Sequence, residues 1–348
     1  MEENVKEAVR LREEVVTANP ADLQALKNLA DVYLQLADVL RSLGRGEEAS
    51  TYFSRAIEKR QRQISLLEKS ELTAEDHDQK LWAYSWIGLS QGSDFNDWHA
   101  AAGTLQEALE VAETASTKFP NHQQTQTNIH SVHNYLARAL DRTGNYRGAL
   151  EHYEKALRAN KNSAARFNLF THSSQVNYMF RIAEMLQKMG QTEQALMKVR
   201  QALDLRREAS AINHADPRDK HAYADSFSQA GKFFAKAGKI DEALSAYREV
   251  ELTLETMMEN GQDHPDVRFA FANSQMLIGD VYADCVVDGC KVSQTNRNRL
   301  REAYDRYKRA ASIYDEQRAH LFGLNVENAK ITQAKLGACA DRLKSRSS

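Results

Sequence analysis

The sequence predicts an all-α fold built from repeated helical hairpins, and three observations lead to that prediction. The 348 residues include only 4 prolines and 15 glycines, and residues that favour helices dominate the remainder. Apolar residues recur at three- and four-residue spacing along most of the chain, which is the period of an amphipathic helix. One pattern also recurs about every 48 residues and marks a unit of two helices joined by a turn.

The clearest copy of this unit spans residues 133–157. Its first helix ends at Gly144, and its second helix carries Ala149 and, one turn further, Tyr153. Small residues let the two helices approach closely, but a single hairpin cannot bury its apolar face alone. The chain is therefore expected to stack its hairpins side by side. The equivalent leading alanines of the six copies are Ala49, Ala101, Ala149, Ala195, Ala243 and Ala303.

We expect one repeat domain over residues 1–348. A helix over residues 3–18 reads as the second half of a hairpin, so we expect excision from a longer protein, with a natural capping helix as the alternative. A C-terminal capping helix is expected over residues 325–344. The expected hairpins cover about residues 21–70, 73–119, 121–160, 171–212, 219–260 and 265–319.

Capping residues mark several expected helix starts. Asn19 and Asp216, each followed by proline, read as N-caps with proline at the first helical position. Thr73 followed by Asp76 predicts a capping box. The polar segment 286–299 lengthens the last hairpin and is expected to form a loop.

The repeated lettering resembles the tetratricopeptide repeat, whose first helix carries an aromatic residue, Leu-Gly and tyrosine, and whose second carries alanine, an aromatic residue and alanine. The unit here is longer, and Leu-Gly is often Leu-Ala. The longer unit resembles the repeats of kinesin light chains, which have links like the one around His264-Pro265. It also resembles the C-terminal repeat region of bacterial serine/threonine kinases, through strings such as LREEVVTANPADLQALKNLADVY.

This resemblance implies a right-handed α-solenoid of tetratricopeptide-like antiparallel hairpins. It also implies a non-catalytic protein-interaction module that binds a protein or peptide segment in a concave groove. The alternative is a regulatory sensor or substrate-recruiting region of a larger bacterial serine/threonine kinase or transcription regulator. A kinase domain, if the parent protein has one, would lie outside this chain.

Composition narrows the partners and the compartment. The net charge of -2 argues against a nucleic-acid clamp, and no apolar run approaches the 18 or so residues of a membrane span. Three cysteines do not form a disulfide framework. We therefore expect a cytoplasmic monomer or weak oligomer. The alternative location is the extracytoplasmic tail of a membrane-anchored parent.

No motif predicts an enzyme, a cofactor or a metal site. The chain lacks a P-loop, a His-Glu-x-x-His motif and a nucleophile elbow. Histidines at 122, 130, 133 and 152 lack completing ligands and are expected to be core or surface residues. Cys339 is expected to be a small buried residue, while pairing of Cys285 with Cys290 stays open.

The first helices of the hairpins are expected to line the groove. The middle of this surface is basic, with asparagines and aromatic residues among the charges, which suits the carboxylates and backbone of an acidic peptide. The candidate binding residues are Trp82, Trp86, Asn134, Arg138, Arg142, Asn177, Arg181, Lys232 and Lys236.

A second interpretation treats the same residues as structural. In this interpretation the cationic side chains of the groove only form a solvent-exposed helix face, and the two tryptophans belong to the core between repeats. The expected ion pairs are then Arg138 with Asp141, Arg181 with Glu184, and Lys232 with Asp225.

Overall fold

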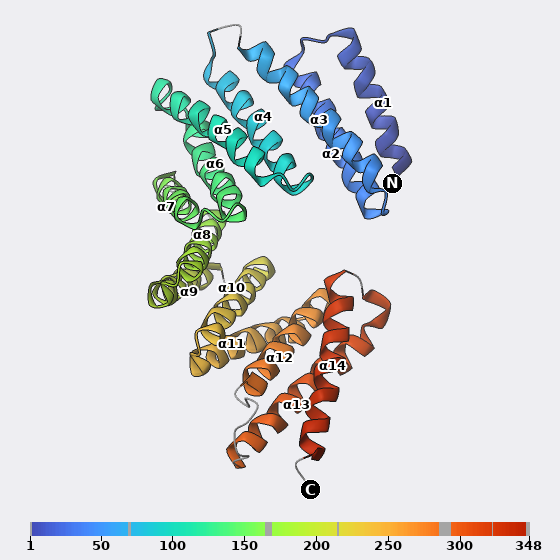
Figure 1. The fold of residues 1–348 in the computed structure, drawn as a ribbon, viewed down its shortest axis with the longest axis vertical. Helices are drawn as coiled ribbons and strands as arrows, with labels where there is room; N and C mark the ends of the chain where they lie inside the picture. The colour runs from blue at the N-terminus through green and yellow to red at the C-terminus, as the bar shows by residue number, and fades with distance from the viewer. Residues whose placement is uncertain are drawn as a thin grey trace. The chain divides into compact units, whose positions relative to one another are not determined.

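The computed structural model describes residues 2–68, 71–163, 169–213, 216–284, 294–321 and 323–345. Within these ranges the protein forms fourteen α-helices, one short 3-10 helix and no strand (Figure 1). Each turn between paired helices is short, so successive helices run antiparallel. The prediction of an all-α fold of helical hairpins is confirmed.

The chain divides into two compact units, residues 1–191 and residues 192–348. One repeat domain over the whole chain stays a prediction. The helices of unit 1 are α1 (Glu2–Ala18), α2 (Leu23–Ser42), α3 (Gly46–Leu67), α4 (Ala74–Ser93), α5 (Trp98–Lys118), α6 (Gln123–Arg142), α7 (Tyr146–Ser163) and α8 (Leu169–Lys188). The helices of unit 2 are α9 (Thr192–Asn213), α10 (Pro217–Lys236), α11 (Ile240–Glu259), α12 (Pro265–Asp284), α13 (Gln294–Glu316), the 3-10 helix η1 (Arg318–His320) and α14 (Leu324–Ser345).

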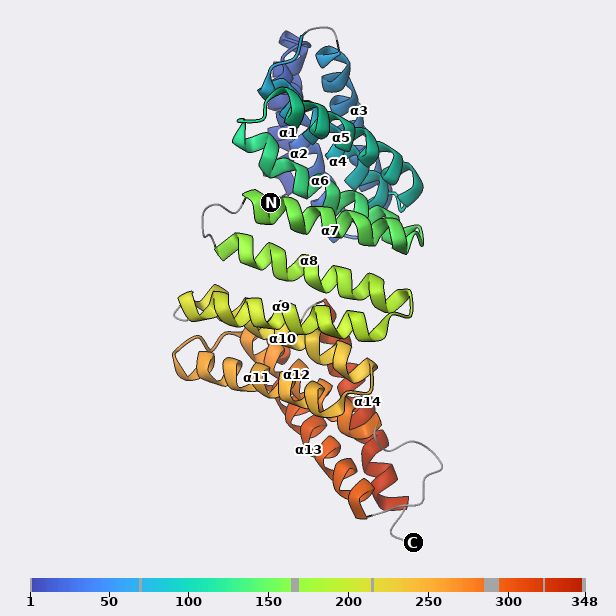
Figure 2. The same ribbon diagram turned by 90° about the vertical axis from the view of Figure 1, so that its left-hand side faces the viewer.

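In unit 1 each helix packs against the next one in the chain, as α7 and α8 do in Figure 2. The core between α2 and α3 contains Leu36, Ala37 and Phe53, all at most 4% exposed. A second core joins α4, α5 and α6 around Leu105 and Leu136. These are the positions that the repeat pattern assigns to packing.

Glycines in the first helices allow close approach of the second helix. A Cβ atom at Gly231 of α10 would lie 2.4 Å from Cε1 of Tyr247 on α11, and one at Gly279 of α12 would lie 2.7 Å from the same atom of Tyr307 on α13. Gly337 occupies the corresponding place in α14, yet a Cβ atom there would have no neighbour within 4 Å. The glycine therefore marks a close helix contact in α10 and α12 but not in α14.

The helix starts agree with two of the three capping predictions. Thr73 and Asp76 form the expected capping box of α4, and Asp216 caps α10 with Pro217 following it. The prediction for Asn19 is wrong, because Asp22 caps α2 by accepting hydrogen bonds from the backbone of Gln24 and Ala25. Pro20 lies in the turn before that helix.

The prediction of a loop over residues 286–299 is wrong for residues 294–299, and residues 286–293 lie outside the described part of the chain. Helix α13 already begins at Gln294, so its first turns include part of the polar segment. Leu300, which follows directly, is 3% exposed and packs with Ala303 and Cys339. Burial of this leucine favours helix in the residues just before it.

Candidate functional site

The first helices of the hairpins form the surface that the sequence singles out. Each unit has its own first-helix face, which we define as the surface of α2, α4, α6 and α8 in unit 1 and the surface of α10, α12 and α14 in unit 2. Of the nine candidate residues, Arg138, Arg142, Asn177, Arg181, Lys232 and Lys236 are exposed. Trp86 is also exposed, while Trp82 and Asn134 are partly buried.

Arg138 and Arg142 meet at an aromatic residue that the sequence reasoning missed. Their guanidinium carbons lie 5.5 and 5.3 Å from the centre of the Trp98 ring, at the start of α5. Arg138 also approaches the hydroxyl of Ser93 at 3.5 Å. Two guanidinium groups on one indole ring gain cation–π attraction, and both side chains remain exposed to solvent. The signal in the sequence was the third tryptophan, just before the repeat alanine Ala101.

Trp98 is itself held tightly. A Cβ atom at Gly92 would lie 2.5 Å from the indole ring, so glycine at this position lets the ring pack against α4. The indole N–H donates to the side chain of Asn96 at 2.9 Å. The ring is therefore a fixed platform beneath the two arginines.

The tryptophans at 82 and 86 separate into two environments. Trp82 packs against the apolar core of α4, α5 and α6, as the structural interpretation expects. Trp86 is 40% exposed. The structure thus places only Trp86 of this pair where a ligand can reach its ring.

The expected ion pairs on the first-helix face form only in part. Arg181 pairs with Glu184 at 3.1 Å. Asp141 pairs instead with Lys188 of α8 at 2.5 Å, so it does not pair with Arg138. Arg181 is therefore partly neutralised on its own helix, whereas Arg138 keeps its charge available.

Unit 2 has a cavity of about 440 Å³ on its first-helix face. Its walls come from α10, α12, the start of α14 and the facing side of α11. Apolar side chains, including Met276, Leu277 and Leu324, provide much of the lining. Its polar groups include Asp225, Lys232, Asn273 and Asn328. Lys232 is the candidate residue that the structure brings into a cavity, while Lys236 lies one turn beyond it on α10.

The polar groups of this cavity are oriented by their neighbours. The side-chain oxygen of Asn273 accepts hydrogen bonds from the Tyr314 hydroxyl at 2.7 Å and from the Asn328 amide at 2.9 Å. Its own amide N–H groups are left to serve another acceptor. Asp225 accepts from Gln229 at 2.8 Å, and Lys232 makes no ion pair within the described residues. The cavity thus presents two kinds of donor, an ammonium and an amide.

The candidate histidines contact different partners and do not gather into one site. His122 lies near Thr125 and Asp78, and His130 contacts the Tyr178 hydroxyl at 3.0 Å. His133 contacts His152 between their Nδ1 atoms at 3.1 Å. In the described part of the chain no cluster of three His, Cys, Asp or Glu residues is arranged to hold a metal ion.

We expect the His133–His152 pair to make the protein less stable at acidic pH. Burial, together with the repulsion from His152, lowers the pKa of His133 to about 4. In the unfolded chain the imidazole binds its proton near pH 6.5. Between about pH 6.5 and pH 4 the unfolded state therefore binds more protons than the folded state does. The free energy of unfolding falls as the pH falls through that window.

The expected loss from His133 is roughly 1 to 3 kcal/mol in the free energy of unfolding. Urea denaturation at pH 7.5 and at pH 4.5 measures it. A His133→Phe variant supplies the aromatic residue that the repeat pattern favours and should show a smaller difference. An equal pH dependence in both proteins would contradict the role of this pair.

The cysteine predictions have different outcomes. Cys339 is 3% exposed on α14, and its thiol donates to the backbone oxygen of Leu300 at 3.3 Å. Burial raises the pKa of this thiol, so it behaves as a small core residue. Cys285 and Cys290 lie outside the described residues.

None of the described helices has the length and apolarity needed to cross a membrane.

The comparisons with known families identify tetratricopeptide repeats in two hairpins. One tetratricopeptide family model matches residues 29–62, and another matches residues 130–163. The second window contains the clearest copy of the unit in the sequence. A search of curated proteins returns no match.

Solved structures share the fold at low sequence identity. BtubC from P. vanneervenii matches with a TM-score of 0.53 and 15% identity, over 74% of this chain and 90% of that one. Aspartyl phosphate phosphatase F from Bacillus subtilis matches with a TM-score of 0.52 and 13% identity, over 94% and 73%. A signal-transduction ATPase with a tetratricopeptide repeat sensor from Pyrococcus horikoshii matches with a TM-score of 0.50 and 13% identity, over 99% and 50%.

Proposed function

We propose, on the premise that the chain is a tetratricopeptide-repeat array, that it is a non-catalytic module that binds an acidic protein or peptide segment on the first-helix face of each unit. The cavity around Lys232 is the observation that carries this proposal. It combines apolar walls with donors that are left for a ligand. Cavities of this kind bury apolar side chains and use a few polar groups for orientation.

The ligand's chemistry follows from the groups in the cavity. Lys232 supplies a positive charge and Asn273 supplies amide donors, which match a carboxylate or a backbone carbonyl. Met276 and Leu277 offer apolar contact. In unit 1, Arg138 and Arg142 above Trp98 add a second cationic surface for the same kind of segment. A partly preformed surface loses little conformational freedom on binding.

The proposal is tested by titrating the protein with a peptide while methyl NMR spectra are recorded. The probe is a fluorescein-labelled peptide in which leucines alternate with glutamates, and the methyl groups of Met276 and Leu277 report on the cavity. We expect Lys232→Glu to weaken binding about tenfold, which corresponds to about 1.4 kcal/mol. Lys308→Glu is the matched control, because Lys308 is exposed on α13 and lines none of the cavities described above.

Two outcomes would contradict the proposal. Equal affinity of the wild type and Lys232→Glu would remove the cavity lysine from binding. An equally tight titration with a peptide carrying lysines in place of glutamates would remove the preference for acidic ligands. The Asn273→Leu variant keeps the side-chain size but lacks the amide. We expect this variant, on its own, also to bind the acidic peptide more weakly than the wild type does.

A second candidate function is regulatory. The similarity of fold to a protein described as having a tetratricopeptide repeat sensor favours a role in which ligand binding is read by an attached domain. Association with a serine/threonine kinase, a bacterial origin and a cytoplasmic location stay predictions from the sequence. The same binding experiments serve both candidates, because a sensor also requires a ligand.

A further inference from the structure

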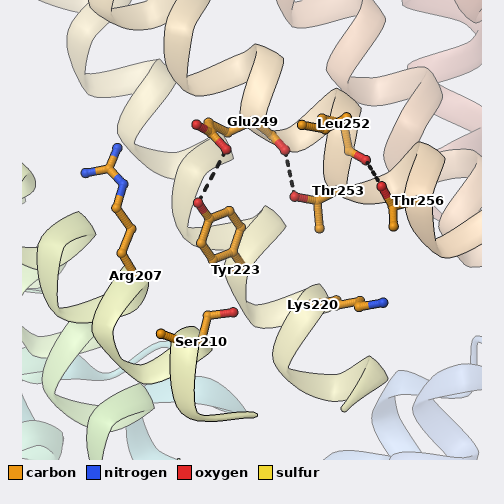
Figure 3. Close-up of a pocket in the computed structure, with 9 residues that line it drawn as sticks. Arg207, Ser210, Lys220, Tyr223, Glu249, Leu252, Thr253 and Thr256 are labelled. Atoms are coloured by element: carbon orange, nitrogen blue, oxygen red, sulfur yellow. Dashed lines mark hydrogen bonds between the residues drawn. The ribbon is translucent and has the colours of Figure 1, made fainter. Parts of the chain in front are cut away.

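A second cavity of unit 2 lies between the second helices α9 and α11, above α10 (Figure 3). We call it the second-helix cleft; the lining residues that define it here are Arg207, Ser210, Lys220, Tyr223, Glu249 and Leu252. Its volume is about 390 Å³. It shares no lining residue with the cavity around Lys232. The two cavities therefore present separate surfaces.

At one end of the space between α9 and α11, an ion pair joins the two helices. Arg200 of α9 donates from Nε and Nη2 to the two carboxylate oxygens of Glu242 on α11, both at 2.9 Å. The guanidinium carbon of Arg200 lies 5.8 Å from the centre of the Phe234 ring on α10. A bidentate pair of this kind fixes both side chains, so α9 and α11 are tied together at this level.

About two turns further along, the same residue types recur without the tie. The guanidinium carbon of Arg207 lies 5.0 Å from the centre of the Phe227 ring. Arg207 is thus placed over Phe227 as Arg200 is placed over Phe234. However, Arg207 pairs with Asp204 on its own helix at 3.2 Å. Glu249 accepts a hydrogen bond from the Tyr223 hydroxyl at 3.4 Å. The arginine and the glutamate thus face neighbours other than each other, and the cleft stays open between them.

The floor and one wall of the cleft are apolar. Tyr223 forms the floor of the cleft, and it stacks on the buried Phe227 ring with ring centres 4.4 Å apart, which holds the tyrosine ring in place. Leu252 on the α11 side is 63% exposed. An exposed leucine beside an aromatic floor gains free energy when a bulky apolar side chain covers both.

The rim of the cleft is cationic on the α9 and α10 sides. Figure 3 shows Arg207 and Lys220 on opposite sides of Tyr223. Lys220 has no ion-pair partner in the residues that the structure describes. The Arg207–Asp204 pair is exposed, with side chains 51% and 69% accessible, and exposed pairs of this kind exchange partners at little cost. Both cations are thus available to a ligand's carboxylate, while Glu249 is engaged by Tyr223.

We propose that the second-helix cleft is an additional binding site that takes a bulky apolar side chain next to a carboxylate, as an acidic segment of a partner protein presents. The apolar group covers Tyr223 and Leu252, and the carboxylate pairs with Lys220 or Arg207. The array then holds one partner on its first-helix face and another between its second helices. This site goes beyond the proposed function and does not depend on it.

The test uses the full chain and two small probes that share an indole ring. Indole-3-propionate carries a carboxylate, whereas tryptamine carries an ammonium. Methyl NMR of labelled alanine, leucine, methionine and threonine groups locates binding, since Ala211, Leu252 and Thr256 report on the cleft. We expect indole-3-propionate to shift these methyls with a dissociation constant on the order of 1 mM. Tryptamine should bind at least about tenfold more weakly.

Two variants separate the contributions. Lys220→Glu should weaken indole-3-propionate about tenfold or more, and Leu252→Ala should reduce binding of both probes. Both positions are at the protein surface or partly accessible, so circular dichroism should show an unchanged fold. Lys308→Glu on α13 is the matched control and should leave binding unchanged.

Each other outcome overturns the site. No shift at the cleft methyls with either probe would show that the cleft does not bind this chemistry. Shifts confined to Met276 and Leu277 would assign the probe to the first-helix cavity and leave the proposed function intact. Equal binding of tryptamine and indole-3-propionate, or an unchanged Lys220→Glu variant, would remove the carboxylate from the recognition.

Discussion

Replacing Asp219 with alanine should lower the free energy of unfolding by about 3 to 5 kcal/mol. Asp219 is 1% exposed at the start of α10, and its carboxylate accepts from Arg206 of α9 at 3.4 Å. Arg206 is 2% exposed, and burial lowers the pKa of its guanidinium despite the nearby carboxylate. Loss of the carboxylate removes this counter-ion from a buried positive charge, and chemical denaturation measures the cost.

The double variant Arg206→Met/Asp219→Leu is the control. Replacing both members of a buried pair with apolar residues of similar size is often close to neutral. We therefore expect the double variant to be more stable than Asp219→Ala. If Asp219→Ala unfolds at the same denaturant concentration as the wild type, the pair contributes nothing to stability and the argument from its burial is wrong.

Replacing Gly231 with alanine should destabilise the protein by about 1 to 3 kcal/mol. The added methyl group would lie 2.4 Å from Cε1 and 2.6 Å from Cζ of Tyr247. Tyr247 is 1% exposed, so its ring has little room to move, and α10 and α11 must separate. Thermal or urea unfolding of the variant measures the effect.

Gly337→Ala tests the same substitution where space is open. Gly337 lies in α14 with no atom within 4 Å of an added Cβ, and alanine favours helix over glycine by up to about 1 kcal/mol. We expect this variant to be slightly more stable than the wild type. Equal effects at the two glycines would show that helix propensity, not the contact with Tyr247, decides the result.

The fold followed from the sequence because the packing positions repeat. Leu136, Ala137 and Tyr153 have counterparts at the equivalent positions of several other hairpins. All three are at most 2% exposed. A pattern that recurs several times averages out the errors of any single helix assignment. The helix starts were less certain because they depend on one or two polar residues. At α2 the sequence pattern pointed to Asn19, whereas the capping residue is Asp22, three positions further along the chain.

The candidate site was only partly predictable, since its contacts join residues far apart in the chain. The sequence suggested Arg138 with Asp141, which are close in the chain. The structure pairs Asp141 with Lys188 on the next first helix and places Arg138 over Trp98. Such partners depend on how neighbouring hairpins are aligned, which the periodicity of one helix does not specify. Lys232 was identified because exposure on a first helix follows from periodicity alone.

The terminal helix α14 is held differently from the helices before it. Lys335 pairs with both oxygens of Asp280 at 2.6 and 2.7 Å, and Thr332 is fully buried, but Leu324 is 82% exposed. Apart from Leu336 and Leu343, which pack on the core with Cys339, few large apolar groups anchor this helix, so we expect it to separate at a lower free energy than the unit as a whole. Leu324 and Asn328 form part of the wall around Lys232. For the ligand binding proposed above, we therefore expect the fraction of molecules with α14 docked to set the fraction competent to bind, and the apparent affinity to scale with it.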